Sequence, residues 1–276
     1  MSDTAFQKQY RDEFVAGFEK RESLARRTCT TEVVFKGNEA VFLVADSGGA
    51  TAVTRGVNGD IPTRPDNLNQ YTATLAEWHD LPEKSDFNIF ASQGNQRQIM
   101  QMTSMAVLNR KIDSDIHTAL SAATVTWGSA AAATLQLVTI AKTKLGNAFA
   151  LGDAPVWALI TPAFHGYLMG LVQFTSHDYI SLKPFEGVPT SRAFSWFGVN
   201  WIVDAGLPGV GTASSTCFMY SQAAIGHAMD KERLETLVGY DGKQAKSWCR
   251  VSGIFGSKLL QNSGVVKMLH NDSALS

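Results

Sequence analysis

Residues 44–71 constrain the fold more than any other part of the chain. These 28 residues read VADSGGATAVTRGVNGDIPTRPDNLNQY and include four glycines, two prolines and three asparagines, with almost no apolar periodicity. Loops without secondary structure that exceed about 12–15 residues are uncommon in compact domains. Any fold proposed for this chain must therefore explain an unusually long connection between secondary-structure elements.

The residues on both sides of this segment are typical of β-strands. Residues 31–45 contain two β-branched and aromatic runs around Lys36, Gly37 and Asn38, a turn signal, and predict a β-hairpin. Residues 71–81 alternate in side-chain character and predict another strand. The long loop is then the tip of a β-excursion. A two-stranded ribbon alone is marginally stable in water, so we expect it to lie on a neighbouring protein; a disordered surface loop is the alternative.

The N-terminal segment predicts an amphipathic helix. Thr4 and Gln7 fit the capping-box pattern S/T-x-x-E/Q. Aromatic residues recur at every fourth position and so share one helix face: Phe6, Tyr10, Phe14 and Phe18. This helix either packs on its own core or lies as an arm on a neighbouring subunit.

A long helix is predicted over residues 92–120. Its apolar side chains recur at spacings of three or four residues: Ile99, Met102, Met105, Leu108, Ile112, Ile116 and Leu120. Charged residues such as Arg110 and Asp113 lie off this stripe. About 27 helical residues form a rod of roughly 40 Å, at 1.5 Å per residue, which is long for a domain of this size.

The remaining sequence alternates between helical and strand-like stretches. Residues 118–141 carry no charge, but they are rich in Ser, Thr and Ala and are interrupted by Trp127-Gly128-Ser129. We therefore predict a helix end, a turn and a new helix here rather than a membrane span. The predicted elements that follow are a helix to Gly146, a buried strand ended by Pro162, a helix, two strands with a turn at Gly198, an apolar strand running into a short helix, and Gly-punctuated apolar runs. This order indicates an α+β fold.

Composition excludes several classes of site. A formal net charge of -1 provides no global basic field to recruit nucleic acid, although a local basic patch stays open. Cys29, Cys217 and Cys249 are far apart and lack zinc-site spacing, so they predict free buried thiols in a reducing compartment. Charged residues make up 18% of the chain, below the roughly 25% of an average domain. Either other chains cover part of the surface, or the low charged fraction is ordinary variation in composition between proteins.

No catalytic motif stands out in the sequence. It contains neither a GxSxG nucleophile elbow nor a Walker A sequence, and GLPGVG at residues 206–211 is typical of a loop. The six histidines are scattered, with no pair at i, i+4 as a helical zinc site needs. We therefore predict no catalytic residue, no metal ligand and no cofactor.

The order of these elements resembles the major capsid proteins of tailed bacteriophages with the Hong Kong 97-type fold. NEAVFLVADSGGATAVTRGVNGDIPTRPDNLNQ followed by WHDLPEKSDFNIFASQGNQRQIM resembles the E-loop and the entry to the spine helix of that family. APVWALITPAFHGYLM is similar to its strand-Pro-helix step, and FTSHDYI, FGVNWIVDAGLP and AAIGHAM are similar to its axial-domain run. The resemblance covers nearly the whole chain and rests on order and spacing.

The resemblance implies a division of the chain into five parts. These are an N-terminal arm (1–30), an extended β E-loop (31–80), a peripheral domain with the spine helix, joined by part of the C-terminal segment (81–128), a mainly axial domain (129–250) and C-terminal return strands (251–276). It also implies that the E-loop lies across a neighbouring subunit and that the N-terminal aromatic stripe contacts another copy. The E-loop tip would supply contacts through Arg55, Asp60, Arg64 and Asp66.

The function implied by the resemblance is self-assembly into the hexamers and pentamers of an icosahedral head around double-stranded DNA. The expected partners are other copies of the chain, a separate scaffolding protein, a portal, a decoration protein and loosely held DNA, with no membrane. The expected location is the host cytoplasm before assembly and the virion afterwards. Some relatives cross-link an E-loop lysine to a neighbour's asparagine; residues 44–81 contain no lysine, and Lys36 is the nearby candidate, so we do not expect a covalent shell.

Two other functions stay open. An encapsulin-like shell that holds a cargo enzyme would share the architecture. A soluble enzyme with an unrecognised site would not, and substitutions at His79 or His177 would test for it.

Overall fold

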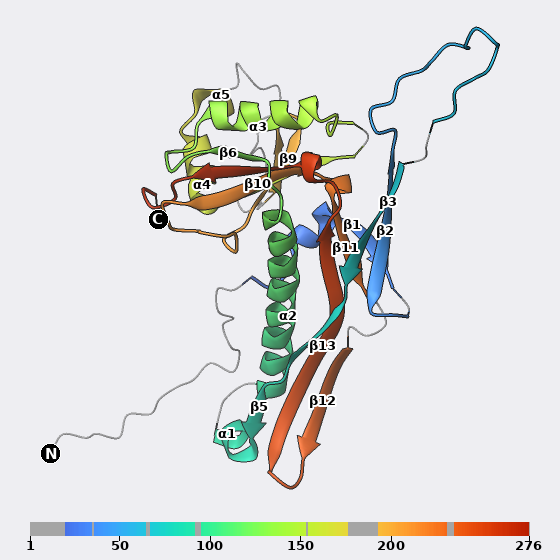
Figure 1. The fold of residues 1–276 in the computed structure, drawn as a ribbon. Helices are drawn as coiled ribbons and strands as arrows, with labels where there is room; N and C mark the ends of the chain where they lie inside the picture. The colour runs from blue at the N-terminus through green and yellow to red at the C-terminus, as the bar shows by residue number, and fades with distance from the viewer. Residues whose placement is uncertain are drawn as a thin grey trace, which may run out of the picture.

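The computed structural model describes residues 20–34, 36–64, 67–91, 95–152, 154–175, 193–230 and 235–275. The predicted N-terminal helix with its aromatic stripe lies outside these residues, as do Asp66 and His177. Within them, the strands form two six-stranded sheets and a two-stranded ribbon. Figure 1 shows an elongated molecule in which one long helix joins an upper sheet to a lower sheet, and the ribbon projects from the side.

The long helix, α2, spans Gln96–Ser121 and confirms the predicted rod. Asn95 caps it by accepting a hydrogen bond from the amide of Gln98. The C-terminal half of the predicted stripe is buried as expected, at Leu108, Ile112, Ile116 and Leu120. Asp113, which we placed off the stripe, is also buried, because partners from the N-terminal segment satisfy its carboxylate.

The lower sheet is organised around one long strand, β13 (Lys246–Leu259). It pairs antiparallel with β4 (Ala76–Asp80), β5 (Glu83–Ser85), β11 (Ile225–Met229) and β12 (Glu235–Asp241). The strand β1 (Thr30–Val33) adds to β11 in parallel, and α1 (Asp86–Ala91) follows β5. The helix α2 runs along β13, so its apolar stripe covers this sheet (Figure 1).

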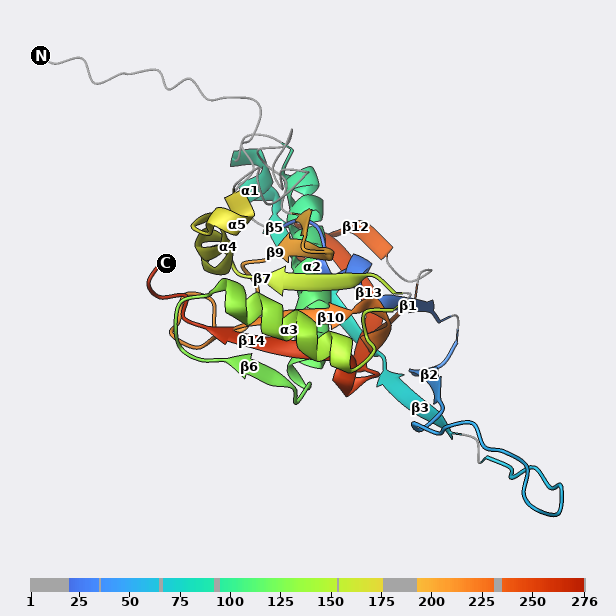
Figure 2. The same cartoon turned by 90° about the horizontal axis from the view of Figure 1, so that it is seen from above.

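The upper sheet has the strand order β6-β14-β10-β7-β9-β8. Its strands are β6 (Thr126–Gly128), β7 (Val156–Ile160), β8 (Ala193–Trp196), β9 (Val199–Val203), β10 (Ser215–Ser221) and β14 (Val265–His270). Seen from above, α3 (Leu135–Asn147) lies over this sheet (Figure 2). Two further helices, α4 (Pro162–Met169) and α5 (Val172–Thr175), follow β7, so the predicted strand-Pro-helix step is confirmed.

Three short 3-10 helices lie at the junctions between these elements. They are η1 (Ala25–Thr28), η2 (Gln222–Ala224) and η3 (Asn262–Gly264). The helix η2 links β10 of the upper sheet to β11 of the lower sheet, and η3 links β13 to β14. One buried apolar cluster extends from α2 through both sheets and includes Ile116, Trp201, Tyr220 and Phe255.

The predicted hairpin over residues 31–45 is wrong. The first run forms β1, which pairs with β11, whereas the second forms β2 (Glu39–Asp46), which pairs with β3 (Asn67–Thr74). The predicted strand over residues 71–81 divides between β3 and β4. The β-excursion itself is confirmed as the antiparallel β2–β3 ribbon, although its loop is shorter than residues 44–71, because both strands extend into that range.

No helix among the residues that the structure describes is both long enough and apolar enough to cross a membrane.

Candidate assembly surfaces

The inner face of the β2–β3 ribbon packs on the chain's own lower sheet. Ala40 and Phe42 of β2 and Ala73 of β3 join Ala228 and Leu260 in a small apolar cluster, separate from the main core. Gly226 makes room for the Phe42 ring, since a Cβ at this position would lie 2.8 Å from the ring. The base of the excursion therefore rests on its own subunit, contrary to our expectation that a neighbouring protein supplies this support.

The outer face of the same ribbon carries exposed apolar side chains, mainly from β2, beside Gln70 and Thr72 of β3. Alternate residues of a strand point to opposite sides, so Val41 and Leu43 face away from the cluster, at 51% and 61% exposure. Leu68, opposite Ala45 in the register, is exposed as well. Single exposed apolar residues are ordinary, but a contiguous row marks a candidate contact surface.

The tip of the ribbon, residues 47–64, is exposed along its whole described length. Its backbone bonds are local: the amide of Gly56 donates to the carbonyl of Asp60, and the amide of Gly59 donates to the carbonyl of Gly56. Arg55, Asp60 and Arg64, our candidate contact residues, all lie on this exposed loop. Figure 1 shows the loop projecting well beyond both sheets.

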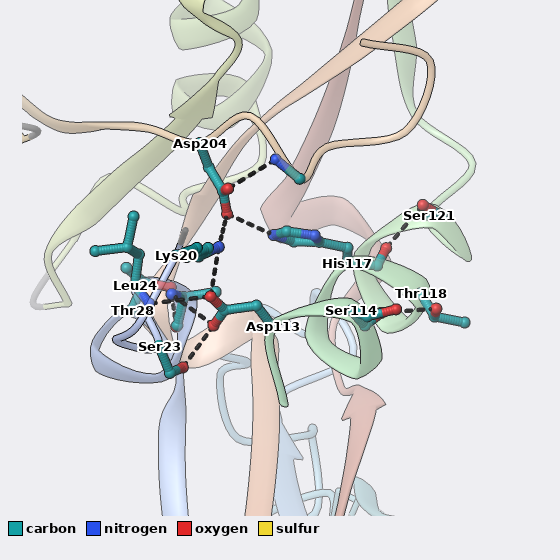
Figure 3. A network of polar contacts seen from close by, with 12 residues as sticks. Lys20, Ser23, Leu24, Thr28, Asp113, Ser114, His117, Thr118, Ser121 and Asp204 are labelled. Carbon is teal, nitrogen blue, oxygen red and sulfur yellow. Dashed lines mark hydrogen bonds and ion pairs between the residues drawn. The ribbon is translucent and has the colours of Figure 1, made fainter. Parts of the chain in front are cut away.

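A buried ionic network lies where the N-terminal segment enters the molecule (Figure 3). The ammonium of Lys20 lies 2.5 Å from Asp113 Oδ2 of α2 and 2.5 Å from Asp204 Oδ2 after β9. His117 Nε2, also on α2, lies 3.3 Å from Asp204 Oδ2. Asp113 and Asp204 are each about 1% exposed. One lysine thus bridges two buried carboxylates that belong to different parts of the fold.

The network holds Asp204 in its ionised form. Burial by itself would raise the pKa of this carboxyl, but the neighbouring His117, the bond from Lys20 and its charge, and the Gly206 amide hold the pKa well below its usual range. Sequence reasoning missed the network. The available signal was that Asp113 and His117, at i and i+4, directly follow the buried residues Ile112 and Ile116.

A second buried polar cluster has the residue types of a hydrolase triad. The hydroxyl of Thr161 donates to Asp272 at 2.8 Å, and His270 Nε2 contacts both Thr161 and Asp272. Cys217 Sγ lies 3.9 Å from His270 Nδ1. All four residues are fully buried or within 1% of it, and burial raises the pKa of the Cys217 thiol. A buried protonated thiol is a poor nucleophile, and the Thr161 hydroxyl instead caps α4. The cluster therefore anchors the C-terminal strand.

The three cysteines are free and buried, as predicted. Within the described residues, no group of three or more His, Cys, Asp or Glu side chains could hold a metal ion. His79 and Glu77 form an exposed pair on β4, where His79 Nε2 lies 3.3 Å from Glu77 Oε1.

Comparison with solved structures gives the same architecture. A structure from Mycobacterium phage Che8 aligns with a TM-score of 0.77 at 12% identity, covering 97% of this chain and 98% of that one. The capsid structure of cyanophage P-SCSP1u aligns with a TM-score of 0.71 at 12% identity, covering 98% and 94% of the two chains. The capsid of a native GTA particle aligns with a TM-score of 0.73 at 11% identity, covering 97% of this chain and 96% of that one.

No curated protein matches the sequence. The family model described as "Phage capsid protein" matches residues 2–272, which is nearly the whole chain. With the fold shared by phage capsid structures, this match places the protein in the virion as a structural component of the head. The chain belongs to the phage capsid protein family and has the Hong Kong 97-like α+β fold.

Proposed function

We propose that copies of this chain assemble into the hexamers and pentamers of a phage head and that the tip of the β2–β3 ribbon lies across a neighbouring copy. One observation carries the proposal: the tip is exposed along its described length, at the end of a ribbon whose base is fixed by packing. Ordering so long a loop costs conformational entropy that contacts must offset. A second copy offers those contacts in a shell of identical subunits.

The tip chemistry suits a contact of this kind. Arg55, Asp60 and Arg64 place both signs of charge on the loop, beside the apolar Val53 and Ile61. Exposed ion pairs contribute only about 0–1 kcal/mol each. Burial of the apolar side chains, repeated at every interface of a shell, makes the larger contribution. In this proposal Asp66 belongs to the same contact, and the N-terminal aromatic stripe contacts another copy.

The division of the chain follows the same proposal. The lower sheet with α2 corresponds to the peripheral domain, and the upper sheet with α3 corresponds to the axial domain. The strands β11 and β12 and the start of β13 belong to the lower sheet, although they fall within residues 129–250, which we expected to be mainly axial. The role is structural rather than catalytic, which the buried cluster around Cys217 supports. A scaffolding protein, a portal and a decoration protein are the further partners proposed. DNA contact is loose and independent of base sequence, consistent with a net charge of -1.

Replacing residues 47–66 by Asn-Gly tests this function. Asp46 and Asn67 are cross-strand partners, so a two-residue type I′ turn can close the ribbon. We expect the shortened chain to unfold at the wild-type denaturant midpoint but to form no closed shells by electron microscopy. A matched full-length variant, Arg55→Ser with Asp60→Ser and Arg64→Ser, separates loop charge from loop length. Closed shells at wild-type yield from the shortened chain would refute the role given to the tip.

A further inference from the structure

Two exposed aromatic residues lie on opposite sides of α3, each beneath a lysine of that helix. Lys142 Nζ lies 4.3 Å from the centre of the Phe197 ring. Lys144 Nζ lies 5.3 Å from the centre of the Trp127 ring. Residues two apart on an α-helix point about 200° apart, at 3.6 residues per turn. Trp127 belongs to β6 and Phe197 follows β8, the first and last strands in the order of the upper sheet. Figure 2 shows β6 and β9, the partner of β8, on opposite sides of α3.

Phe197 has a backbone conformation that phenylalanine disfavours. The register pairs Trp196 with Val199, so Phe197 and Gly198 form a two-residue turn between β8 and β9. Their φ angles of 58° and 69° are those of a type I′ turn, which favours Asn-Gly. A β-carbon in the left-handed region destabilises the folded chain. Backbone strain that a fold retains indicates a function for the strained residue.

Contacts within the subunit fix this turn, yet the Phe197 ring still projects from it. The ammonium of Lys142 donates to the Phe197 carbonyl at 2.5 Å, in addition to its contact with the ring. The Trp196 ring lies 5.8 Å from the Phe197 ring, centre to centre. Phe197 is nevertheless 45% exposed. An aromatic side chain on a fixed turn loses little freedom when it binds, which suits it to anchor an interface.

A hollow of about 450 Å³ lies on the other side of α3, beside Trp127. It is lined by β6, the loop after β6, the start of α3 and Leu269 of β14. Its lining residues are all uncharged and include the apolar Trp127, Leu137 and Leu269. A cavity of about 150 Å³ accepts benzene, so this hollow has room for the ring of a phenylalanine.

We propose that the Phe197 ring of one copy of this chain inserts into the hollow beside Trp127 of the next copy. A second copy is the occupant because the ring and the hollow lie on opposite sides of the same layer. Contacts between two different surfaces of identical chains are head-to-tail, and they generate closed rings when the rotation between copies closes. Burial of the aromatic ring in an uncharged hollow stabilises the contact. This inference rests on the proposed assembly into hexamers and pentamers and names one contact that builds these rings.

Phe197→Asn separates a role in assembly from a role in folding. Asparagine adopts the type I′ turn more readily, so we expect the denaturant midpoint of the wild type or a higher one. The yield of closed shells by electron microscopy should fall at least about tenfold, because the anchor is lost. Ala245→Asn is the matched control: Ala245 has a φ of 50° in an exposed turn of the lower sheet, and this variant should assemble as the wild type does. Wild-type shell yield from Phe197→Asn, or an equal loss from Ala245→Asn, would overturn the inference.

Filling the hollow tests the same contact from the other side. Ala132 is an exposed residue of its lining. We expect Ala132→Trp to keep the wild-type denaturant midpoint and to reduce the shell yield as Phe197→Asn does, because the added ring takes the space of the incoming one. Ala132→Ser is the matched control and should assemble normally. Normal shell yield from Ala132→Trp would show that nothing enters the hollow and would overturn the inference.

Cross-linking of assembled full-length chains tests the direction of the contact. Ser195→Cys places a thiol on β8 near Phe197, and Gln136→Cys places one at the hollow. Both positions are exposed, whereas the native cysteines are buried. With a bismaleimide, whose arm tolerates an offset between the two thiols, the double variant should give bands of three and more chains on a denaturing gel. Each copy then contacts two different neighbours, as a head-to-tail ring requires.

Each single variant should give no such ladder of bands. Bands of the double variant that stop at two chains would show a symmetric pair, and closed shells without cross-linked bands would show no contact at this place. Either result would overturn the inference and leave the proposed assembly standing. A wild-type chain that stays monomeric would refute the proposed assembly as well.

Discussion

His227 of β11 faces Ser257 of β13 across the lower sheet, with the imidazole Nδ1 3.0 Å from the serine hydroxyl. The His227 side chain is fully buried. Burial lowers its pKa from 6.5 to about 4; the positive charge of Arg26 acts in the same direction, and Asp113 opposes it. This histidine is therefore neutral in the folded chain at neutral pH.

Acidification should destabilise the folded chain through His227. The unfolded chain takes up this proton near pH 6.5, whereas the folded chain takes it up only near pH 4. The contribution to stability is therefore fully present above pH 6.5 and is lost as the pH falls toward 4. At 1.36 kcal/mol per pKa unit, the loss approaches about 3 kcal/mol. Urea unfolding at pH 7 and pH 4.5 measures it.

His227→Gln should reduce this dependence on pH, because glutamine does not titrate. The exposed His79 provides a matched control, and His79→Gln should keep the wild-type slope. Other carboxyl groups also titrate below pH 5, so the comparison between variants isolates the histidine. An unchanged slope in His227→Gln would show that the acid sensitivity arises elsewhere.

The sequence predicted those features whose causes are local. The stripe from Leu108 to Leu120 identified α2, and Asn95 provides its cap. Four glycines and Pro62 in residues 47–64 identified the exposed tip, because these residues disfavour regular structure. The sequence likewise predicted the strand-Pro-helix step at Pro162, because proline is favoured in the first turn of a helix.

Features that depend on distant partners were missed. The residues of β1 carried a hairpin signal, but β1 pairs with β11, nearly 200 residues away, and no local pattern specifies a parallel partner. Asp113 was placed off the apolar stripe of α2, and a charge is rarely buried without a partner. Its partner, Lys20, lies outside the helix, so the site at the N-terminal segment could not be derived from the periodicity of α2.

Thiol reagents should leave the native chain unmodified. Burial raises the pKa of Cys29 to about 12 and also raises the pKa values of Cys217 and Cys249. At pH 8 the reactive thiolate is therefore scarce as well as inaccessible. We expect no rapid reaction with a chromogenic disulfide in buffer and reaction of all three thiols in guanidinium. A Ser47→Cys variant, whose new thiol is exposed on the tip, is the positive control. Rapid labelling of the native wild-type chain would contradict the burial of its three cysteines.

Phe149 should be a site where glycine increases stability. It follows α3 with a φ of 57°, in the left-handed region that side chains with a β-carbon disfavour. The predicted helix end at Gly146 is confirmed to within one residue: α3 ends at Asn147, and the amide of Phe149 donates to the Gly146 carbonyl. The Phe149 ring is 93% exposed, so its removal costs little packing.

We expect Phe149→Gly to raise stability by about 0.5–1 kcal/mol, since relief of about 1–2 kcal/mol of strain exceeds the added entropy of glycine in the unfolded chain. Phe149→Ala keeps the β-carbon and should give no gain. Denaturant midpoints at constant m-value measure both. An equal gain from alanine would mean that the exposed ring, rather than the backbone conformation, was unfavourable.

Neighbouring residues of β2 should separate the stability of the subunit from its assembly. Phe42 fills the apolar cluster beneath the ribbon, whereas Leu43 points outward at 61% exposure. Phe42→Ala leaves a cavity that costs about 3–5 kcal/mol in a packed core. Because the cluster is separate from the main core, we expect this loss to detach the ribbon, seen as increased protease cleavage within β2 and β3.

Leu43→Ala should change the unfolding free energy by less than about 0.5 kcal/mol, because it removes an exposed side chain. Its effect should appear only in assembly, as a lower yield of closed shells at equal protein concentration, since the outer face of the ribbon then offers less apolar area to a neighbouring copy. Light scattering during assembly measures the yield. If Leu43→Ala assembles with the wild-type yield, the outer face of the ribbon takes no part in the contact, and the contact is confined to the tip.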